Sequence, residues 1–400
     1  MRDKSPPEQQ NSIAILAHNL EFGGAAVACA RLVTSFRQAG FEVETHLVNQ
    51  RKIVKHKTNA FNFGRFSAAI YSRVDLIICK YLSPHGNHWA STGLIGQISA
   101  RKILKENPPF LNIHWIGHAT ISLNQISRIN IPMLITSHDE WWLNGVSHYS
   151  TPNSLEAGSL ARKQILKYIL RKKEKILNLP NVGIVCLSQE MLEKFLLVYP
   201  NLRGRVRIIP NPVDESIFHP LALEARLFAV PTAAYLGGFS DTRKGYDLLL
   251  EVLKKCTEKF NVVATGFEGE LLTGTHKQIR VIGIPKISDG KVLNELYNNV
   301  EITIVPSRQE ALPQVATESL MSGTPVISFR VGGLRDILFT DRSGITIDNF
   351  DTTTFAEKLD FCMKIQLKRE IKPEIFANEN FAPSVVVEKY LDFYESLNTR

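Results

Sequence analysis

Short runs of apolar residues alternate with longer stretches in which apolar residues recur at helical spacing. "SIAILAH" (12–18) predicts a strand, a Gly-Gly turn and a helical stretch ending at Gly40 follow, and "FEVETHLVN" (41–49) predicts the next strand. This order makes a βαβ unit, and its repetition is typical of a parallel sheet covered by helices. Further strands are predicted at 110–115, 131–137 and 181–188, with a helical stretch at about 154–177. Residues 50–108 give no clear pattern.

A second alternating series begins after "RVRIIPNPVDESIFHP" (205–220), where a strand ends and prolines break the pattern. Strands are predicted at 232–238, 260–266, 279–284, 301–307, 324–329 and 344–348, with helices at 244–256, 291–299 and about 313–322. We therefore divide the chain into a disordered lead-in at 1–11, domains at 12–218 and 219–383, and a last helix at 384–400. We expect two doubly wound, Rossmann-like α/β domains facing each other across a cleft, with the last helix packing back on the first domain.

Length and composition agree with two ordinary globular domains. A chain of 400 residues exceeds what one hydrophobic core usually supports, and 44% hydrophobic with 22% charged residues is an average composition. No apolar run is long enough to span a bilayer, and the polar start lacks the apolar segment of a signal peptide. The five cysteines are scattered, which indicates neither zinc nor a disulfide framework and favours the reducing cytoplasm. The net charge of +8 favours nucleic acid, anionic lipid or phosphorylated ligands without choosing among them.

Two carboxylates flank the start of a helix in "EALPQVATESLMSGTPVIS". Glu310 follows the predicted buried strand "EITIVPS", and Glu318 lies within the helix that begins near Pro313. The N–H groups at such a helix start suit a diphosphate, and each carboxylate can accept two hydrogen bonds from a sugar diol. Alternatively, Glu310 is solvated and Glu318 only interacts with the helix dipole.

Two other loops after predicted strands carry candidate ligand groups. Lys244, with Arg243 beside it, can neutralise a departing diphosphate, although a solvated basic turn also explains the pair. Gly23 and Gly24 would let the backbone approach a ligand closely, although a tight turn between strand and helix explains them equally well.

Several histidine and tryptophan residues follow predicted strands of the first domain in the sequence. His138 and Asp139 directly follow the strand "MLITS", and a lone His-Asp pair is more often structural than catalytic. The side chains of His114, Trp115, Trp141 and Trp142 could form a floor on which a sugar stacks. Core packing is the alternative for these rings, and we favour it for at least one tryptophan.

Several of these segments together resemble family-4 retaining glycosyltransferases, which have the two-domain GT-B fold. "EALPQVATESLMSGTPVIS" resembles the E-x7-E signature of that family. The glycine loop "FGGAAVACARL", "TSHDEWW", "IIPNPVDESIFHP", "GGFSDTRKGYDLLL" and "VGGLRDIL" match further family motifs in the expected order. The resemblance covers most of the chain outside about 50–108. The residues of the His-Asp and interdomain segments are most similar to those of bacterial exopolysaccharide enzymes of the colanic-acid type.

The resemblance implies a retaining hexosyl transfer from a nucleotide sugar to a saccharide acceptor, in particular a lipid-linked one. It assigns catalytic roles to Glu310, Lys244 and His138. It implies that the donor is bound by Gly23, Gly24, Arg243, Lys244, Leu312, Pro313, Gln314, Val315 and Glu318. It implies that the acceptor is contacted by His114, Trp115, Asp139 and Trp141. Many relatives carry an arginine where this chain has Gly238 or Phe239, so Arg243 would have to substitute for it.

Three further expectations concern partners and rival functions. The basic amphipathic stretch 161–177 can lie on an anionic membrane surface at the inner face of the plasma membrane, or pack on the core with its charges in water. No D-x-D triplet occurs, so neither a metal site nor another cofactor is expected. A GT-B epimerase is the alternative enzyme. A dinucleotide oxidoreductase would need G-x-G-x-x-G, and a nucleic-acid binder would need a reading motif, and neither is present.

Overall fold

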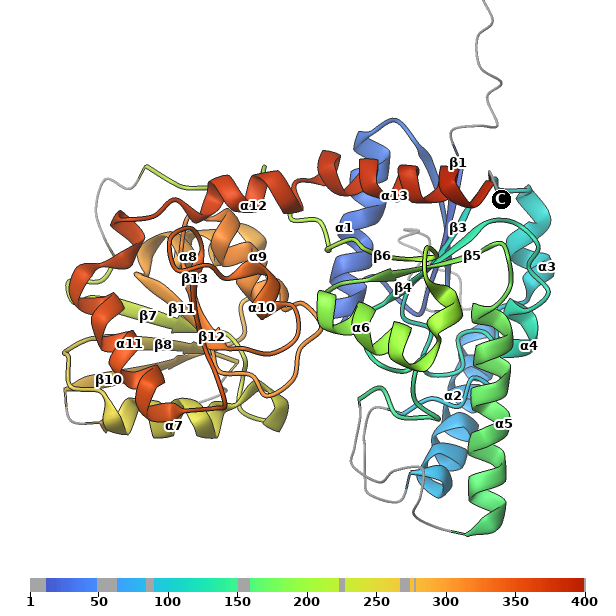
Figure 1. Cartoon of the computed structure of the whole chain (residues 1–400), viewed down its shortest axis with the longest axis horizontal. Coiled ribbons are helices and arrows are strands. Elements are labelled where there is room, and N and C mark those ends of the chain that lie inside the picture. The colour runs from blue at the N-terminus through green and yellow to red at the C-terminus, as the bar shows by residue number, and fades with distance from the viewer. Residues whose placement is uncertain are drawn as a thin grey trace, which may run out of the picture. The chain divides into compact units, whose positions relative to one another are not determined.

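The computed structural model describes residues 12–48, 63–83, 90–149, 159–222, 227–266, 274–276 and 278–398 (Figure 1). The chain forms two compact units. The N-terminal unit comprises Met1–Leu187, Met191–Ile209 and Val387–Arg400, and the C-terminal unit comprises Ser188–Glu190 and Pro210–Val386. The lead-in predicted at 1–11 lies outside the described residues.

The N-terminal unit is built on a parallel sheet. Within the described residues it has six strands in the order β2-β1-β3-β4-β5-β6, and every pairing is parallel. The strands are β1 (Ser12–Ala17), β2 (Glu42–Leu47), β3 (Leu111–Ile113), β4 (Met133–Ser137), β5 (Val182–Cys186) and β6 (Val206–Ile208). β4 and β5 are buried throughout, as expected for strands covered on both faces.

Helices connect these strands. They are α1 (Gly24–Gln38), α2 (Phe63–Leu82), α3 (Ala100–Ile103), α4 (Leu123–Ile126), α5 (Leu160–Leu177) and α6 (Gln189–Val198), with 3-10 turns η2 (Leu104–Glu106) and η3 (Pro200–Leu202). The unclear stretch 50–108 thus contains α2 and α3. From Val387 on, the last helix α13 (Pro383–Asn398) belongs to this unit, where Tyr390 Oη lies 2.9 Å from Thr136 Oγ1 on β4.

The C-terminal unit has a sheet of seven strands within the described residues, in the order β13-β12-β11-β7-β8-β10-β9. The strands are β7 (Thr232–Tyr235), β8 (Asn261–Thr265), β9 (Gly274–His276), β10 (Ile279–Ile284), β11 (Ile302–Val305), β12 (Val326–Phe329) and β13 (Gly344–Ile347). Only β9 is antiparallel, and the sequence pattern did not predict it. The helices are α7 (Tyr246–Lys255), α8 (Gly290–Asn299), α9 (Gln314–Met321), α10 (Leu334–Ile337), α11 (Thr352–Ile365) and α12 (Pro373–Phe381), with 3-10 turns η4 (Thr242–Lys244) and η5 (Leu367–Arg369).

Each sheet reverses its strand order at one place, and this place determines where ligands can bind. In the C-terminal unit the chain builds outward from β7 to β8 and β10, and then returns to β11 on the other side of β7. In the N-terminal unit the reversal lies between β1 and β3. Crevices form beyond the carboxyl ends of strands at such switch points, so the loops after β7 and β11, and after β1, β3 and β4, surround the candidate sites.

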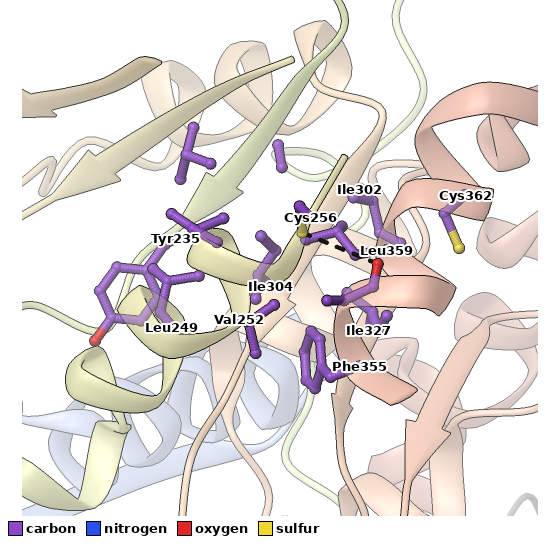
Figure 2. Packing of buried hydrophobic residues seen from close by; sticks show 14 of the residues in the cluster. Tyr235, Leu249, Val252, Cys256, Ile302, Ile304, Ile327, Phe355, Leu359 and Cys362 are labelled. Carbon is purple, nitrogen blue, oxygen red and sulfur yellow. Dashed lines mark hydrogen bonds between the residues drawn. The ribbon is translucent and has the colours of Figure 1, made fainter. Parts of the chain in front are cut away.

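The C-terminal core lies between the sheet and the pair α7 and α11. Figure 2 shows Val252 of α7 and Phe355 of α11 beside Ile304 of β11 and Ile327 of β12 in one buried cluster. All four side chains are 0–1% exposed. Because protein interiors are packed without spare volume, a truncation here leaves a cavity.

Phe355→Ala is expected to lower the free energy of unfolding of the C-terminal unit by about 3–5 kcal/mol, through lost burial and the cavity left behind. Phe361→Ala is the matched control, because Phe361 lies on the same helix and is 52% exposed. Urea denaturation compares the two variants. Equal losses would show that α11 is not packed as described.

Candidate functional site

The C-terminal unit brings Lys244 and Glu310 together. Lys244 ends the η4 turn after β7, and Glu310 lies in the loop after β11. Lys244 Nζ donates to Glu310 Oε1 at 2.6 Å, and the Ser307 hydroxyl donates to the same oxygen at 2.8 Å. The Lys244 side chain is 30% exposed and that of Glu310 is 11% exposed, so the pair is accessible from one side. Glu310 is therefore not the solvated carboxylate of the alternative interpretation.

Two glycines bring the loops of this site into contact. Gly245 follows Lys244 with φ +68°, and a Cβ there would overlap the carbonyl oxygen of Pro306. Gly332, from the "VGGLRDIL" segment, has φ +50°, and a Cβ there would overlap the carbonyl oxygen of Glu310. Both positions need glycine because of the left-handed backbone and the close approach of another loop. They hold Lys244 and Glu310 in place.

Gly245→Ala is expected to destabilise the C-terminal unit more than Gly238→Ala does. Gly238 has φ +67°, but a Cβ there would meet nothing within 4 Å, so alanine adds only left-handed strain, about 1–2 kcal/mol. At Gly245 the overlap with Pro306 should add about 1–3 kcal/mol. Thermal denaturation of both variants measures the difference. Equal losses would mean that the η4 turn does not lie against the loop after β11.

Glu318 lies on the buried side of α9. It is 5% exposed, and Tyr297 Oη donates to its Oε2 atom at 3.1 Å. Glu318 therefore does more than interact with the helix dipole, which was the alternative interpretation. Pro313 occupies the N-cap position of α9, and its side chain makes no capping hydrogen bond. Leu312 packs in the interior, whereas Gln314 and Val315 form the first turn next to Glu310 in the chain.

The two arginines near Lys244 are both held by carboxylates. Arg243 donates to Asp241 through Nε at 3.0 Å and through NH2 at 2.6 Å. Arg308 makes a similar two-point contact with Asp247 at 2.7 and 2.6 Å, and its side chain also lowers the pKa of that aspartate. The charge of Arg243 is thus balanced inside the turn, which leaves Lys244 as the cation nearest to Glu310 within this turn.

The N-terminal unit has a small pocket beyond the carboxyl ends of β3 and β4. It is lined by His114, Trp115, Ile116, Gly117, Thr136, Ser137, His138, Asp139, Trp141, Trp142 and His148. The four predicted acceptor-binding residues and His138 are thus together in one place. His138 and Trp115 are partly exposed there, while the others of this group are buried.

Asp139 takes part in a buried hydrogen-bond network. Its Oδ2 lies 2.6 Å from His148 Nδ1, and its Oδ1 accepts from the Trp141 backbone N–H at 2.9 Å. Burial alone would raise the pKa of Asp139, but the neighbouring His148 outweighs it and holds the pKa below its usual range. His148 Nε2 lies 3.1 Å from Ser91 Oγ. This connectivity resembles a hydrolase triad, yet Ser91 is 2% exposed, so no substrate can reach it and the network is structural.

Two of the predicted acceptor contacts need revision. Trp141 is 3% exposed, its Nε1 donates to Ser91 O at 2.7 Å, and Lys173 Nζ lies 3.6 Å from its ring centroid. Core packing, the alternative given for the tryptophans, describes it better than a sugar-stacking floor. His114 is 2% exposed and lies behind His138. A sugar in this pocket would meet Trp115 and His138 first.

Lys173 of α5 differs from both interpretations of the basic stretch 161–177, because its charged group lies in the interior and not in water or at a membrane surface. It is completely buried, and its Nζ donates to the carbonyl oxygens of Trp141, Asn144 and Gly145 at 2.5, 2.8 and 2.9 Å. Burial lowers its pKa well below the usual lysine range. Arg162 is also buried, and its Nε donates to Leu82 O at 2.8 Å. These two cations fasten α5 to its neighbours.

Gly23 and Gly24 begin α1 after β1. Gly23 has φ +95°, and a Cβ at either position would meet nothing within 4 Å. No packing inside the described chain therefore requires Gly24 to lack a side chain. Open space beside the first turn of a 15-residue helix is compatible with a ligand approaching the backbone there.

Partly buried histidines should make the N-terminal unit sensitive to acid. Burial lowers the pKa of His18 and of His138 to about 4, and the charge of His118 contributes for His18. Between about pH 6.5 and pH 4 the unfolded chain binds protons that the folded unit excludes. Its free energy of unfolding should therefore be highest above this window and fall as the pH drops through it. Urea denaturation across the window measures this, and a flat profile would contradict the burial of these rings.

Several residues of these sites could not be selected from the sequence. Ser307 and Tyr297 support the two glutamates, and Ser91 and His148 support Asp139. Ser307 closes the predicted strand "EITIVPS", so its place after a buried strand was an available signal. Nothing local in the sequence marks the other three.

Two family models match this chain. The model described as Glycosyltransferase Family 4 matches residues 22–217, and the one described as Glycosyl transferases group 1 matches residues 230–364. Together they cover most of both units. This chain belongs to the family-4 glycosyltransferases. The family predicted from the motifs is therefore confirmed.

Curated relatives of this family-4 member match it in part. The D-inositol 3-phosphate glycosyltransferase of Xylanimonas cellulosilytica is 28% identical over 199 residues, which cover 44% of this chain and 47% of the relative. An uncharacterized 41.2 kDa protein in the cps region of Klebsiella pneumoniae is 27% identical over 169 residues, covering 40% and 45%. The chain thus spans about half the length of such relatives.

Solved structures match over nearly the whole chain at low identity. Sucrose-phosphate synthase from Thermosynechococcus elongatus gives a TM-score of 0.64 at 17% identity, covering 98% of this chain and all of that one. Anabaena Alr3699/HepE in complex with UDP and glucose gives 0.57 at 12% identity, covering 96% and 99%. These likenesses confirm the GT-B fold class predicted for this family-4 glycosyltransferase. Among the described residues, none of its helices combines the length and apolar character needed to cross a bilayer.

Proposed function

We propose that this protein is a retaining glycosyltransferase that moves a hexose from a nucleotide sugar to a saccharide acceptor in bacterial surface or exopolysaccharide synthesis. The observation that carries the proposal is the 2.6 Å pair of Lys244 and Glu310 at the switch point of the C-terminal sheet. Glu318 on the adjoining helix adds a second carboxylate. Family membership and a solved relative that binds UDP-glucose support the same donor class.

The C-terminal unit would hold the donor. Glu318 accepts hydrogen bonds from the ribose, and Glu310 contacts the hexose. Lys244 and the first N–H groups of α9, at Gln314 and Val315, face the diphosphate. A preorganised cation and helix N–H groups stabilise the charge that develops on the departing diphosphate. Under this proposal they perform the electrostatic role that a metal ion has in other transferases, so the reaction needs no metal.

We infer the chemistry from the family to which the chain belongs. The acceptor hydroxyl attacks the anomeric carbon on the face from which the diphosphate departs, so the configuration is retained. The bond from the anomeric carbon to the phosphate oxygen breaks as the new glycosidic bond forms, and the departing phosphate oxygen takes the acceptor proton. His138 and Trp115 contact a sugar in the N-terminal pocket, and Gly23 and Gly24 let a ligand approach the backbone at the start of α1.

Thermal denaturation with UDP, GDP, ADP and NAD tests the donor class. A ligand that binds only the native state stabilises it by RT ln(1 + [L]/Kd), about 2.7 kcal/mol at a hundredfold excess over Kd. We expect a rise in Tm with one nucleoside diphosphate, which would identify the base. A rise with NAD alone, or with none of the four ligands, would refute the proposed donor site.

We also propose that α2 and α5 contact an anionic membrane, which would bring the enzyme to a lipid-linked acceptor at the cytoplasmic face. The apolar side chains Ile70, Val74, Ile77 and Tyr81 follow one stripe of α2 and are 41–68% exposed. On α5, Lys167, Arg171 and Lys175 are exposed at intervals of four residues. Apolar residues beside exposed cations are typical of helices that lie in an anionic lipid surface.

Co-sedimentation with vesicles tests this surface. The protein should bind vesicles containing phosphatidylglycerol and not pure phosphatidylcholine, and Ile77→Asp should abolish binding. Leu197→Asp is the matched control, because Leu197 is 82% exposed but lies on α6. Equal loss in both variants, or no binding by the unmodified protein, would overturn the proposal.

A further inference from the structure

His138 is part of a pair of imidazoles at the carboxyl ends of β3 and β4. His114 Nδ1 lies 2.8 Å from His138 Nε2, with 5.1 Å between the ring centroids and 28° between the ring planes. His138 lines the pocket and is partly exposed, whereas His114 lies behind it and is 2% exposed. The His114 backbone N–H donates to Leu16 O on β1 at 2.9 Å, which fixes the inner residue to the sheet.

At neutral pH a single proton lies between the two rings. Burial lowers the pKa of both histidines, and the nearby Asp139 raises that of His138 only partly, so both rings are neutral. A neutral imidazole has one N–H donor and one acceptor nitrogen. A hydrogen bond between the rings therefore has two forms. Either His114 Nδ1 donates to His138 Nε2, or His138 Nε2 donates to His114 Nδ1.

The far nitrogen of His114 distinguishes these two forms. His114 Nε2 is buried and has no hydrogen-bond partner among the described residues. If His138 donated, the proton of His114 would be on this nitrogen, and a buried N–H donor would be left without an acceptor. If His114 donates, Nε2 is only an unused lone pair. Buried donors without partners are rarer in proteins than under-used acceptors, so the form in which His114 donates is favoured.

We propose that His114 is a positioning residue that holds His138 in the tautomer with its proton on Nδ1. Within the described residues His138 Nδ1 makes no hydrogen bond, so it is the nitrogen left for a ligand. In this form it presents a donor and can bind a sugar hydroxyl or a phosphate oxygen. It cannot remove a proton from the acceptor. This role rests on the proposed function, in which the departing phosphate oxygen takes that proton.

Nitrogen-15 NMR of protein with labelled histidine rings tests the tautomer without any substrate. The His138 signals, assigned by their loss in His138→Asn, should show protonated Nδ1 and bare Nε2 near pH 7. His114→Asn keeps an amide donor near the position of Nδ1 and should preserve this pattern. His114→Phe fills the space without a donor and should shift the His138 proton towards Nε2. Protonated Nε2 in the unmodified protein would overturn the proposal even if neither His114 variant folds.

Kinetics with the identified donor separate this role from a packing role. His114→Phe should lower kcat/KM about tenfold, the value of one hydrogen bond, while His114→Asn stays within about twofold. His138→Asn should retain more activity than His138→Gln, because the asparagine amide lies near the position of Nδ1. Equal loss in His114→Asn and His114→Phe would refute the positioning role. The absence of any transfer by the unmodified protein would refute the proposed function and leave the NMR result standing.

Discussion

Replacing Lys244 with alanine is expected to lower the rate of glycosyl transfer about 10²–10³-fold, the effect typical of removing one preorganised group that stabilises developing charge. Lys244 follows β7 at the switch point, and its Nζ is 2.6 Å from Glu310. In the alanine variant the departing diphosphate lacks this cation. Glu310 still accepts the Ser307 hydrogen bond, but lysine no longer balances its negative charge.

Steady-state kinetics of Lys244→Ala and Lys254→Ala measure this effect. Lys254 lies on the exposed side of α7, close in sequence, and its replacement should leave kcat unchanged. Because Lys244 and Glu310 interact directly, the double variant Lys244→Ala, Glu310→Gln should lose less activity than the sum of the two single losses in free energy. A Lys244→Ala enzyme within about threefold of the unmodified rate would remove this lysine from the mechanism.

Glu318→Ala is expected to weaken nucleoside diphosphate binding about 100-fold. A ribose diol donating two hydrogen bonds to a carboxylate contributes roughly 3 kcal/mol, which corresponds to that factor in Kd. Tyr297→Phe is the matched control. It removes the 3.1 Å hydrogen bond to Glu318 Oε2 but keeps the carboxylate, so it should change Kd by less than about tenfold.

Calorimetric titration with the nucleotide found by thermal denaturation gives both dissociation constants. Because Glu318 is buried, its replacement also changes stability, so the free energy of unfolding of each variant is measured together with its dissociation constant. A Glu318→Ala protein that is destabilised but binds the nucleotide with unchanged Kd would show that Glu318 supports only the fold.

The strands that form the two sheets could be predicted because each carries its own signal. Runs such as "MLITS" and "ITIV" are apolar throughout, since both faces of a parallel strand are covered. β9 was not predictable, because a three-residue strand depends on its antiparallel partner β10 and not on its own pattern. α2 was missed because its exposed apolar stripe obscures the usual division into a buried and a polar face.

The candidate site also has residues that could be predicted from the sequence and residues that could not. The loops of Glu310, Lys244 and His138 could be located, because a loop that follows a predicted strand must lie at the carboxyl edge of the sheet. The partners of these residues could not. Tyr297 approaches Glu318 from α8, and His114 approaches His138 from the position directly after β3. Burial of Lys173 also depends on three carbonyl groups about 30 residues away, which no helical periodicity encodes.

The anomeric configuration of the product tests the central claim most directly. Purified protein is incubated with the nucleotide sugar whose nucleotide raises its Tm and with a saccharide acceptor, and the new linkage is followed by proton NMR from the first minutes. We predict a glycoside with the same anomeric configuration as the donor, formed together with one nucleoside diphosphate. An inverted glycoside would contradict the retaining mechanism, and an epimerised nucleotide sugar with no acceptor consumed would contradict glycosyl transfer itself.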